Sequence, residues 1–297
     1  MGRMKGRQWL GLALALAGSQ ALAATSCPPE GWSRDDLQTL KAGDFKVQTD
    51  DRRARLALGL LDCLASPDPA LRDGIAFEAW STWLRADQLD VATRSAALEQ
   101  LLPRIAPQAA AGDGFAAPFA ALVLSEIARG WRHPGRDRLL AAGAEYLASV
   151  HDYRGFDERE GWRHGVAHGA DLMLQLALNP ALDKAQLDRI FTAVARQVAP
   201  PGHAYVFGEP ARLARPVLYG ALRGLHSQAD WDDWFESLTS PAPAPTWREA
   251  VATPSGLARR HDLRAFLLEI QVEIADDPRP ALAAMRPAVQ AALKRVP

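Results

Sequence analysis

The feature that most limits the fold of this chain is a run of helix-length segments joined by short turns. Apolar residues recur with a period of about 3.6 in each segment, and Gly, Pro or Asp residues separate one segment from the next. No stretch shows a convincing strand pattern. Short connections make neighbouring helices antiparallel, so we expect an all-α chain. Its architecture should be an α/α superhelical solenoid of antiparallel hairpins (HEAT- or armadillo-like) or an α/α toroid. The clearest segments are 115–131, 135–150, 162–178, 183–198 and 211–225.

The first 23 residues have the organisation of a secretory signal peptide. A basic start is followed by an apolar stretch and by a small-residue cleavage site that ends at Ala23. The apolar stretch is too short to span a bilayer and no second one follows, so we expect no transmembrane segment in the mature chain. A lipoprotein anchored through Cys27 is the weaker alternative. We therefore expect a periplasmic or secreted protein, with an N-terminal arm carrying a short helix over 24–48 and one helical domain over 49–297.

Charge argues against some classes of partner. The full chain has 34 basic and 35 acidic residues, and cleavage after Ala23 would remove three basic residues and no acidic one. The mature chain would then carry a net charge of about −4, which disfavours nonspecific binding to nucleic acid. We expect an unknown small-molecule ligand or a protein partner, and no nucleic acid.

Two cysteines, Cys27 and Cys63, remain after cleavage. An exported protein meets an oxidising environment, so a disulfide between the arm and the helix around Cys63 is one expectation. The alternative is a pair of free thiols, with Cys63 acting as a small apolar core residue.

A polar stripe marks the helix predicted over 162–178. On a helical wheel of about 100° per residue, four polar side chains fall within some 60° of one another, and apolar residues fill nearly all the rest. A helix of this kind is buried, so its stripe must face a hydrogen-bond network, a metal ion or a groove. The four residues are His164, His168, Asp171 and Gln175.

Three chemistries fit this stripe. His164, His168 and Asp171 could ligate a divalent transition metal such as zinc, although Gly165 stands where an HExxH motif has its Glu. The same three residues could act as acid and base in a hydrolase. A structural network, with the acids of the 152–160 loop capping the helix, is the third interpretation.

Other residues near the stripe are candidates for ligand contact. Trp162 directly precedes it and could stack on a ligand such as a sugar, or could pack the helix start. Asp152, Arg154 and Gln175 complete the predicted ligand-binding set. Further along, Glu209 and Arg212 form a possible i, i+3 ion pair that could face the stripe from the next inner helix.

The residues from Asp152 to Asp171 also carry a family resemblance. The stretch is similar to the signature of a bacterial family of unknown function, DUF2785, which has a D-x-R-G loop followed by G-W-x-H-x-x-A-H-x-A-D. The resemblance extends over about residues 50–290, implies an all-helical, repeat-like fold and supplies no activity. The matching positions are Asp152, Arg154, Gly155, Gly161, Trp162, His164, Ala167, His168, Ala170 and Asp171.

Two functions therefore stay open at this point. The first is an exported protein with a His/Asp site that binds a metal or small ligand, with hydrolysis as its possible reaction. The second is a non-catalytic helical-repeat scaffold that binds a protein or peptide in the cell envelope. A scaffold has little need of two His and one Asp on its least solvated helix, so we favour the first.

Overall fold

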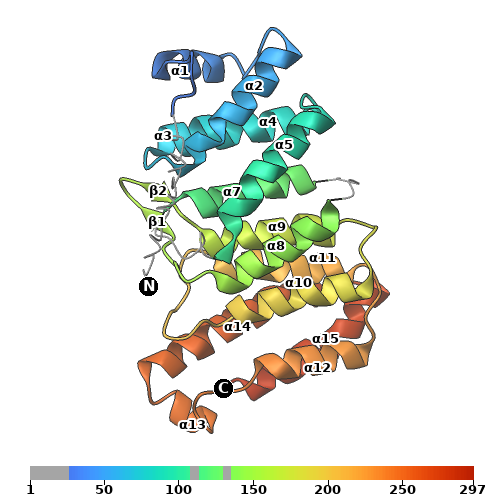
Figure 1. The fold of residues 1–297 in the computed structure, drawn as a ribbon. Helices are drawn as coiled ribbons and strands as arrows, with labels where there is room; N and C mark the ends of the chain where they lie inside the picture. The colour runs from blue at the N-terminus through green and yellow to red at the C-terminus, as the bar shows by residue number, and fades with distance from the viewer. Residues whose placement is uncertain (1–26, 108–113, 130–134) are drawn as a thin grey trace, which may run out of the picture.

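The computed structural model, which describes residues 27–107, 114–129 and 135–297, is mostly helical (Figure 1). The predicted signal peptide lies outside these residues. The α-helices are α1 Arg34–Ala42, α2 Asp50–Leu60, α3 Pro69–Leu71, α4 Glu78–Arg85, α5 Val91–Leu101, α7 Ala116–Ala128, α8 Arg136–Ser149, α9 Gly165–Ala177, α10 Lys184–Gln197, α11 Glu209–Ala221, α12 Gln228–Leu238, α13 Trp247–Ala250, α14 Pro254–Ile274 and α15 Pro280–Arg295. Two 3₁₀ turns, η1 Asp62–Ala65 and η3 Leu102–Ile105, and one π-helix, η2 Arg72–Phe77, complete the helical elements.

Several helices begin where the sequence supplies a capping side chain. Ser33 accepts the Asp36 N–H while the Asp36 side chain accepts the Ser33 N–H, so α1 begins with a capping box. Asp183 starts α10 and Ser227 starts α12 in the same way. These caps satisfy amides that have no partner within the helix, which fixes where each helix starts.

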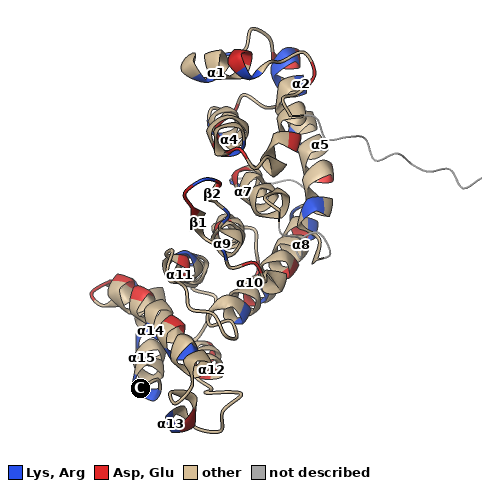
Figure 2. Cartoon of the chain, turned by 90° about the vertical axis from the view of Figure 1, so that its left-hand side faces the viewer, with Lys and Arg blue, Asp and Glu red and all other residues tan. Residues whose placement is uncertain are grey.

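The helices lie in two layers. One, named layer A, stacks α4, α7, α9 and α11; the other, layer B, contains α5, α8 and α10 (Figure 2). The stack bends so that layer A lies on its concave side (Figure 2). Consecutive helices alternate between layers, as short turns between antiparallel helices require.

Glycines bring α8 and α9 close together. A Cβ on Gly143 would lie 2.7 Å from the Leu172 side chain, and one on Gly169 would lie 3.0 Å from Leu147. α8 and α9 therefore pack against each other at close range. Within layer A, α9 packs between α7 and α11 (Figure 2).

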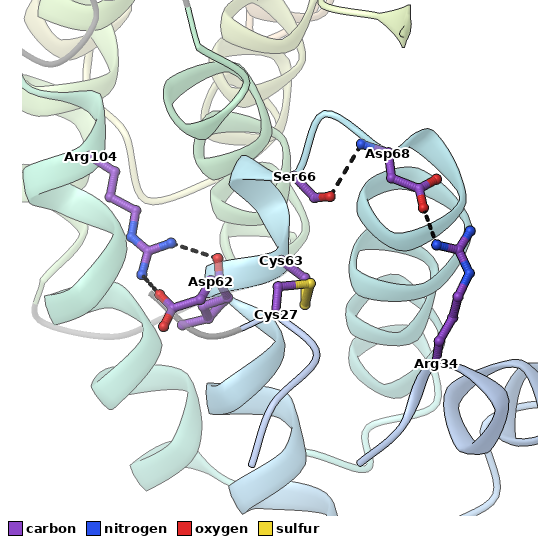
Figure 3. The surroundings of a disulfide bond; sticks show 8 residues. Cys27, Arg34, Asp62, Cys63, Ser66, Asp68 and Arg104 are labelled. Atoms are coloured by element: carbon purple, nitrogen blue, oxygen red, sulfur yellow. Dashed lines mark hydrogen bonds and ion pairs between the residues drawn. A yellow bond between two sulfur atoms is a disulfide. The ribbon is translucent and has the colours of Figure 1, made fainter. Parts of the chain in front are cut away.

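The disulfide is present: Cys27 is bonded to Cys63 across 36 residues of sequence (Figure 3). Beside it, Arg104 donates to the Leu61 carbonyl and the Asp62 carboxylate (Figure 3). Arg34 pairs with Asp68 nearby. These links attach the N-terminal arm and η1 to the rest of the stack.

One expectation about the backbone is wrong. Residues Phe156–Asp157 (β1) and Gly161–Trp162 (β2) pair as a short antiparallel hairpin before α9. Strands of two residues are too short to show an alternating pattern in the sequence.

Among the described helices, none is long and apolar enough to cross a lipid bilayer.

Candidate functional site

The hairpin before α9 presents two large aromatic side chains. Phe156 is opposite Trp162 in the strand register, and their ring centroids are 5.0 Å apart. Asp157 accepts the N–H groups of Arg159 and Glu160 at 2.8 and 2.9 Å, which closes the turn. Both rings remain exposed, Phe156 to 48% and Trp162 to 39%. Large apolar side chains exposed side by side are typical of a binding surface.

A buried arginine from an earlier helix, Arg72, holds this hairpin in place. Arg72 in η2 is fully buried and donates to the carbonyl groups of Glu160, at 2.6 Å, and Ser66, at 2.9 Å. Its guanidinium lies over the rings of Phe115 and Phe119, with centroids at 3.8 and 4.8 Å. A buried cation needs such carbonyl and aromatic partners. Arg72 therefore fixes the position of the hairpin relative to α7.

The loop before α11 closes the site from another side. A Cβ on Gly155 would lie 2.0 Å from the Phe207 ring, so only glycine allows this approach. Phe207 in turn lies edge-on to Trp162, at 6.0 Å between centroids. Val206, beside it, is 73% exposed. We call Phe156, Trp162, Val206 and Phe207 the aromatic patch.

His164 lies directly beneath this patch. It precedes the first residue of α9 and has φ 52°, in the left-handed region that non-glycine residues seldom occupy. Its ring lies 4.1 Å from that of Trp162. Burial, and then the positive charge of Arg212, lower the pKa of His164 to about 4, so the imidazole is neutral near pH 7.

The carboxylate of Glu209 faces this imidazole. Glu209 is the first residue of α11, is 3% exposed and accepts the Phe207 N–H at 3.0 Å. Its Oε1 lies 4.0 Å from His164 Nε2, which is buried and has no hydrogen-bond partner among the described residues. A polar contact with the Phe207 backbone raises the pKa of His164, against the larger effect of burial. In the tautomer with the ring proton on Nδ1, His164 Nε2 is an acceptor. Two acceptors, Nε2 and Oε1, then face each other across a gap that suits a shared donor.

His168 is enclosed more completely than His164. Its Nδ1 lies 3.2 Å from the carbonyl oxygen of Pro118, and its ring packs edge-on against Phe119. Burial is the main reason that its pKa falls to about 3. His168 therefore helps to join α9 to α7 as a neutral residue.

Asp171 is held by the next helix of layer A. Arg212 donates through Nε to Asp171 Oδ1 at 3.0 Å and through Nη2 to Oδ2. Burial raises the pKa of Asp171, while the two nearby arginines, Arg212 and Arg215, oppose that rise. The guess that Glu209 and Arg212 face the stripe from the neighbouring helix is confirmed. They do so separately, each with its own partner, and not as a pair with each other.

The predicted metal-ligand set is not assembled. His164 lies outside the helix, His168 faces a carbonyl group and Asp171 is bonded to an arginine. Over residues 27–107, 114–129 and 135–297, no group of three His, Cys, Asp or Glu side chains could hold a metal ion. The prediction assumed that one regular helix carries all three residues, and the left-handed backbone at His164 breaks that register.

The other predicted ligand-binding residues have different surroundings. Arg154 forms a two-pronged pair with Asp152, whose pKa falls despite its partial burial. Gln175 is half-buried, two turns further along α9 than His168. Of the four predicted residues, Trp162 alone belongs to the aromatic patch. The loop acids do not cap α9, since Asp157 closes the hairpin and Glu160 pairs with Arg163.

Comparison with known families identifies the chain. A model of DUF2785, described as a protein of unknown function, matches residues 109–272. The chain belongs to the DUF2785 family. Comparisons with curated proteins and with solved structures found no match.

The DUF2785 match includes most of the site. The aromatic patch, His164, Asp171, Glu209 and Arg212 all fall within residues 109–272. Arg72, which anchors the hairpin, lies before them. In this DUF2785 member, the site therefore depends on a residue from outside the matched region, and no motif in the sequence pointed to that residue.

Proposed function

We propose that this protein is an exported, solenoid-like DUF2785 member that binds a small ligand at the aromatic patch above His164 and Glu209. The ligand would lie against Trp162 and share a hydrogen-bond donor between the imidazole and the carboxylate. One observation carries this proposal: His164 Nε2 is buried, has no partner among the described residues and lies 4.0 Å from Glu209 Oε1. A buried polar atom without a partner costs stability and calls for a functional explanation.

The solenoid part of the proposal is supported by the alternation of layers. Successive layer A helices lie one above another and successive layer B helices follow the same path (Figure 2). This is the organisation of HEAT- and armadillo-like arrays, in which each hairpin contacts mainly its neighbours. An open stack also agrees with a solenoid better than with a closed toroid.

Export is supported by the N-terminal sequence and by the disulfide. Residues 1–23 have the three regions of a signal peptide. The Cys27–Cys63 disulfide would be stable in the periplasm or outside the cell and is unusual in a reducing cytosol.

The chemistry of the patch suggests the class of ligand. Trp162 offers a flat apolar face, and the acceptors beneath it favour a ligand that donates through hydroxyl groups. A neutral saccharide combines a flat C–H face with a rim of hydroxyl groups. We therefore infer a saccharide, with Arg154 and Asp152 at the edge of the same loop.

Hydrolysis is the second candidate function. A neutral imidazole next to a carboxylate can accept a proton, so His164 would be the base at Nε2 and Glu209 would stabilise the imidazolium that forms. His168 and Asp171, the other predicted catalytic residues, are engaged by Pro118 and Arg212. They would then position α9 and would not touch the substrate.

The test is ligand-detected NMR with the mature protein and a panel of neutral gluco-, xylo- and manno-oligosaccharides. Trp162→Ala should weaken binding of any hit at least about tenfold, which equals about 1.4 kcal/mol. Tyr219→Ala is the matched control, because Tyr219 is an equally exposed aromatic on α11 outside the patch. If no oligosaccharide binds, or if Trp162→Ala binds as well as wild type, the proposal is wrong. A protein or peptide scaffold then becomes the better account of the patch.

A further inference from the structure

Two carboxylates on layer A, one buried and one partly buried, hold three arginines in a common pattern. Glu126 of α7, which is 6% exposed, accepts from Arg85 at 3.0 and 2.6 Å and from Arg129 at 3.2 and 3.4 Å. Asp171 of α9 accepts from Arg212 in the same two-pronged way. Each arginine uses its Nε and Nη2 atoms for the carboxylate. In the described part of the chain, no hydrogen bond reaches the Nη1 of any of the three.

The guanidinium groups remain accessible. The side chains of Arg85, Arg129 and Arg212 are 56%, 48% and 34% exposed. Arg85 and Arg129 share one carboxylate, so that cluster keeps one uncompensated positive charge.

The two clusters are neighbours on the same layer. Glu126 lies on α7 and Asp171 on α9, and these two helices are adjacent in the stack (Figure 2). Helices α4, α7, α9 and α11 thus each contribute to one row of charged groups. A row of guanidinium groups fixed by these carboxylates is preorganised, because the arginines have already lost their rotamer freedom.

We propose that this row binds the carboxylate or phosphate groups of an anionic ligand through the Nη1 atoms of Arg85, Arg129 and Arg212. Charge-assisted hydrogen bonds from arginine to such groups are stronger than those between neutral groups, and the fixed planar forks favour their geometry. The inference goes beyond the saccharide site and does not depend on it, because none of the three arginines belongs to the aromatic patch.

The experiment is thermal unfolding of the mature protein with citrate or inorganic phosphate, against sodium chloride at the same ionic strength. Binding should give a saturable rise in Tm above the chloride control. A rise with citrate alone would assign the site to carboxylate groups. A rise with phosphate alone would assign it to phosphate groups. No rise beyond chloride with either anion would overturn the proposal.

Variants locate the effect. Arg129→Gln leaves Glu126 paired with Arg85, so the fold should persist while the anion binds about tenfold more weakly. Asp171→Asn combined with Arg212→Gln removes the second pair without leaving a buried charge alone and should also weaken binding. Arg138→Gln is the control, since it removes the same charge from an exposed pair with Glu99 on layer B. Unchanged affinity in Arg129→Gln, or an equal loss in Arg138→Gln, would contradict the assignment. Trp162→Ala should not alter the response, which separates this result from the saccharide test.

Discussion

Among the described residues, His226 and His164 each lie beside a carboxylate, and the two pairs differ in whether the nitrogen that faces the acid is bonded to it. His226 Nε2 lies 2.8 Å from Asp188 Oδ1, and its ring packs against Phe191 and Trp231. His164 Nε2 lies 4.0 Å from Glu209 Oε1. Each ring has one buried nitrogen without a partner among the described residues, Nδ1 in His226 and Nε2 in His164.

The difference separates a structural pair from a site. At His226 the nitrogen that faces the acid is bonded, and Asp188 is half-exposed, so water can solvate the carboxylate. At His164 the facing nitrogen is unbonded, the carboxylate is buried and the backbone is left-handed. Three costs meet at the His164–Glu209 pair, which is typical of a functional position, whereas the His226 pair carries only one of them, the unpartnered Nδ1.

The largest expected effect comes from removing the anchor above His164. Arg72→Met leaves the carbonyl groups of Ser66 and Glu160 without their donor and should lower the free energy of unfolding by about 3–5 kcal/mol. Urea unfolding of the mature protein measures this change. Arg138→Met, in an exposed pair, should change stability by less than about 0.5 kcal/mol. A loss below about 1 kcal/mol for Arg72→Met would mean that the hairpin does not depend on this residue.

The pH dependence of stability should show the burial of His164. The unfolded chain takes up protons on histidine below about pH 6.5, whereas burial holds the folded pKa of His164 at about 4. The contribution of neutral His164 to the free energy of unfolding is therefore fully present above pH 6.5. It is lost as the pH drops towards 4, and the total loss is about 3 kcal/mol.

His164→Asn isolates that contribution, because asparagine tolerates the left-handed backbone. Between pH 6 and 4.5 the free energy of unfolding of this variant should fall less steeply than that of wild type. The two slopes should differ by about 1.4 kcal/mol per pH unit. Other titrating groups, such as the buried Asp262 with its raised pKa, act equally in both proteins. Identical slopes would show that His164 is not desolvated.

The smallest expected changes in stability come from replacing each of the two acids, Glu209 and Asp188, by its amide. Glu209→Gln supplies an amide donor for His164 Nε2 and should raise stability by about 1 kcal/mol while weakening ligand binding. Asp188→Asn removes a charge that already has its partner and should lower stability by about 0.5 kcal/mol. Thermal unfolding of both variants gives the signs. Loss of stability in Glu209→Gln would mean that the His164 pair is satisfied after all.

The sequence predicted the helices well because their signals are local. The short helix expected within 24–48 is α1, with the capping residues Ser33 and Gly43 at its ends, and the apolar pattern predicted α9 together with its polar stripe. The direction of the stripe was less predictable. A regular helix would align His164 with His168, but His164 adopts φ 52° one residue before the helix begins.

Long-range partners could not be predicted from spacing. Arg72 meets Glu160 across 88 residues, and Arg212 meets Asp171 across 41. Nothing in the residues around Arg72 distinguishes it from an ordinary helix-surface arginine. The resemblance over Asp152–Asp171 pointed to the right loop, and the contacts that complete the site come from other helices.

Long-range ¹H–¹⁵N NMR of the histidine ring nitrogens, in the free protein and with a ligand from the saccharide panel, tests the central claim most directly. The account predicts that His164 Nε2 carries no proton in the free protein near pH 7 and that its signal moves when ligand binds, while the His226 signals stay unchanged. A protonated Nε2 bonded to Glu209 in the free protein, unaffected by any ligand, would contradict it and make His164 a second structural pair.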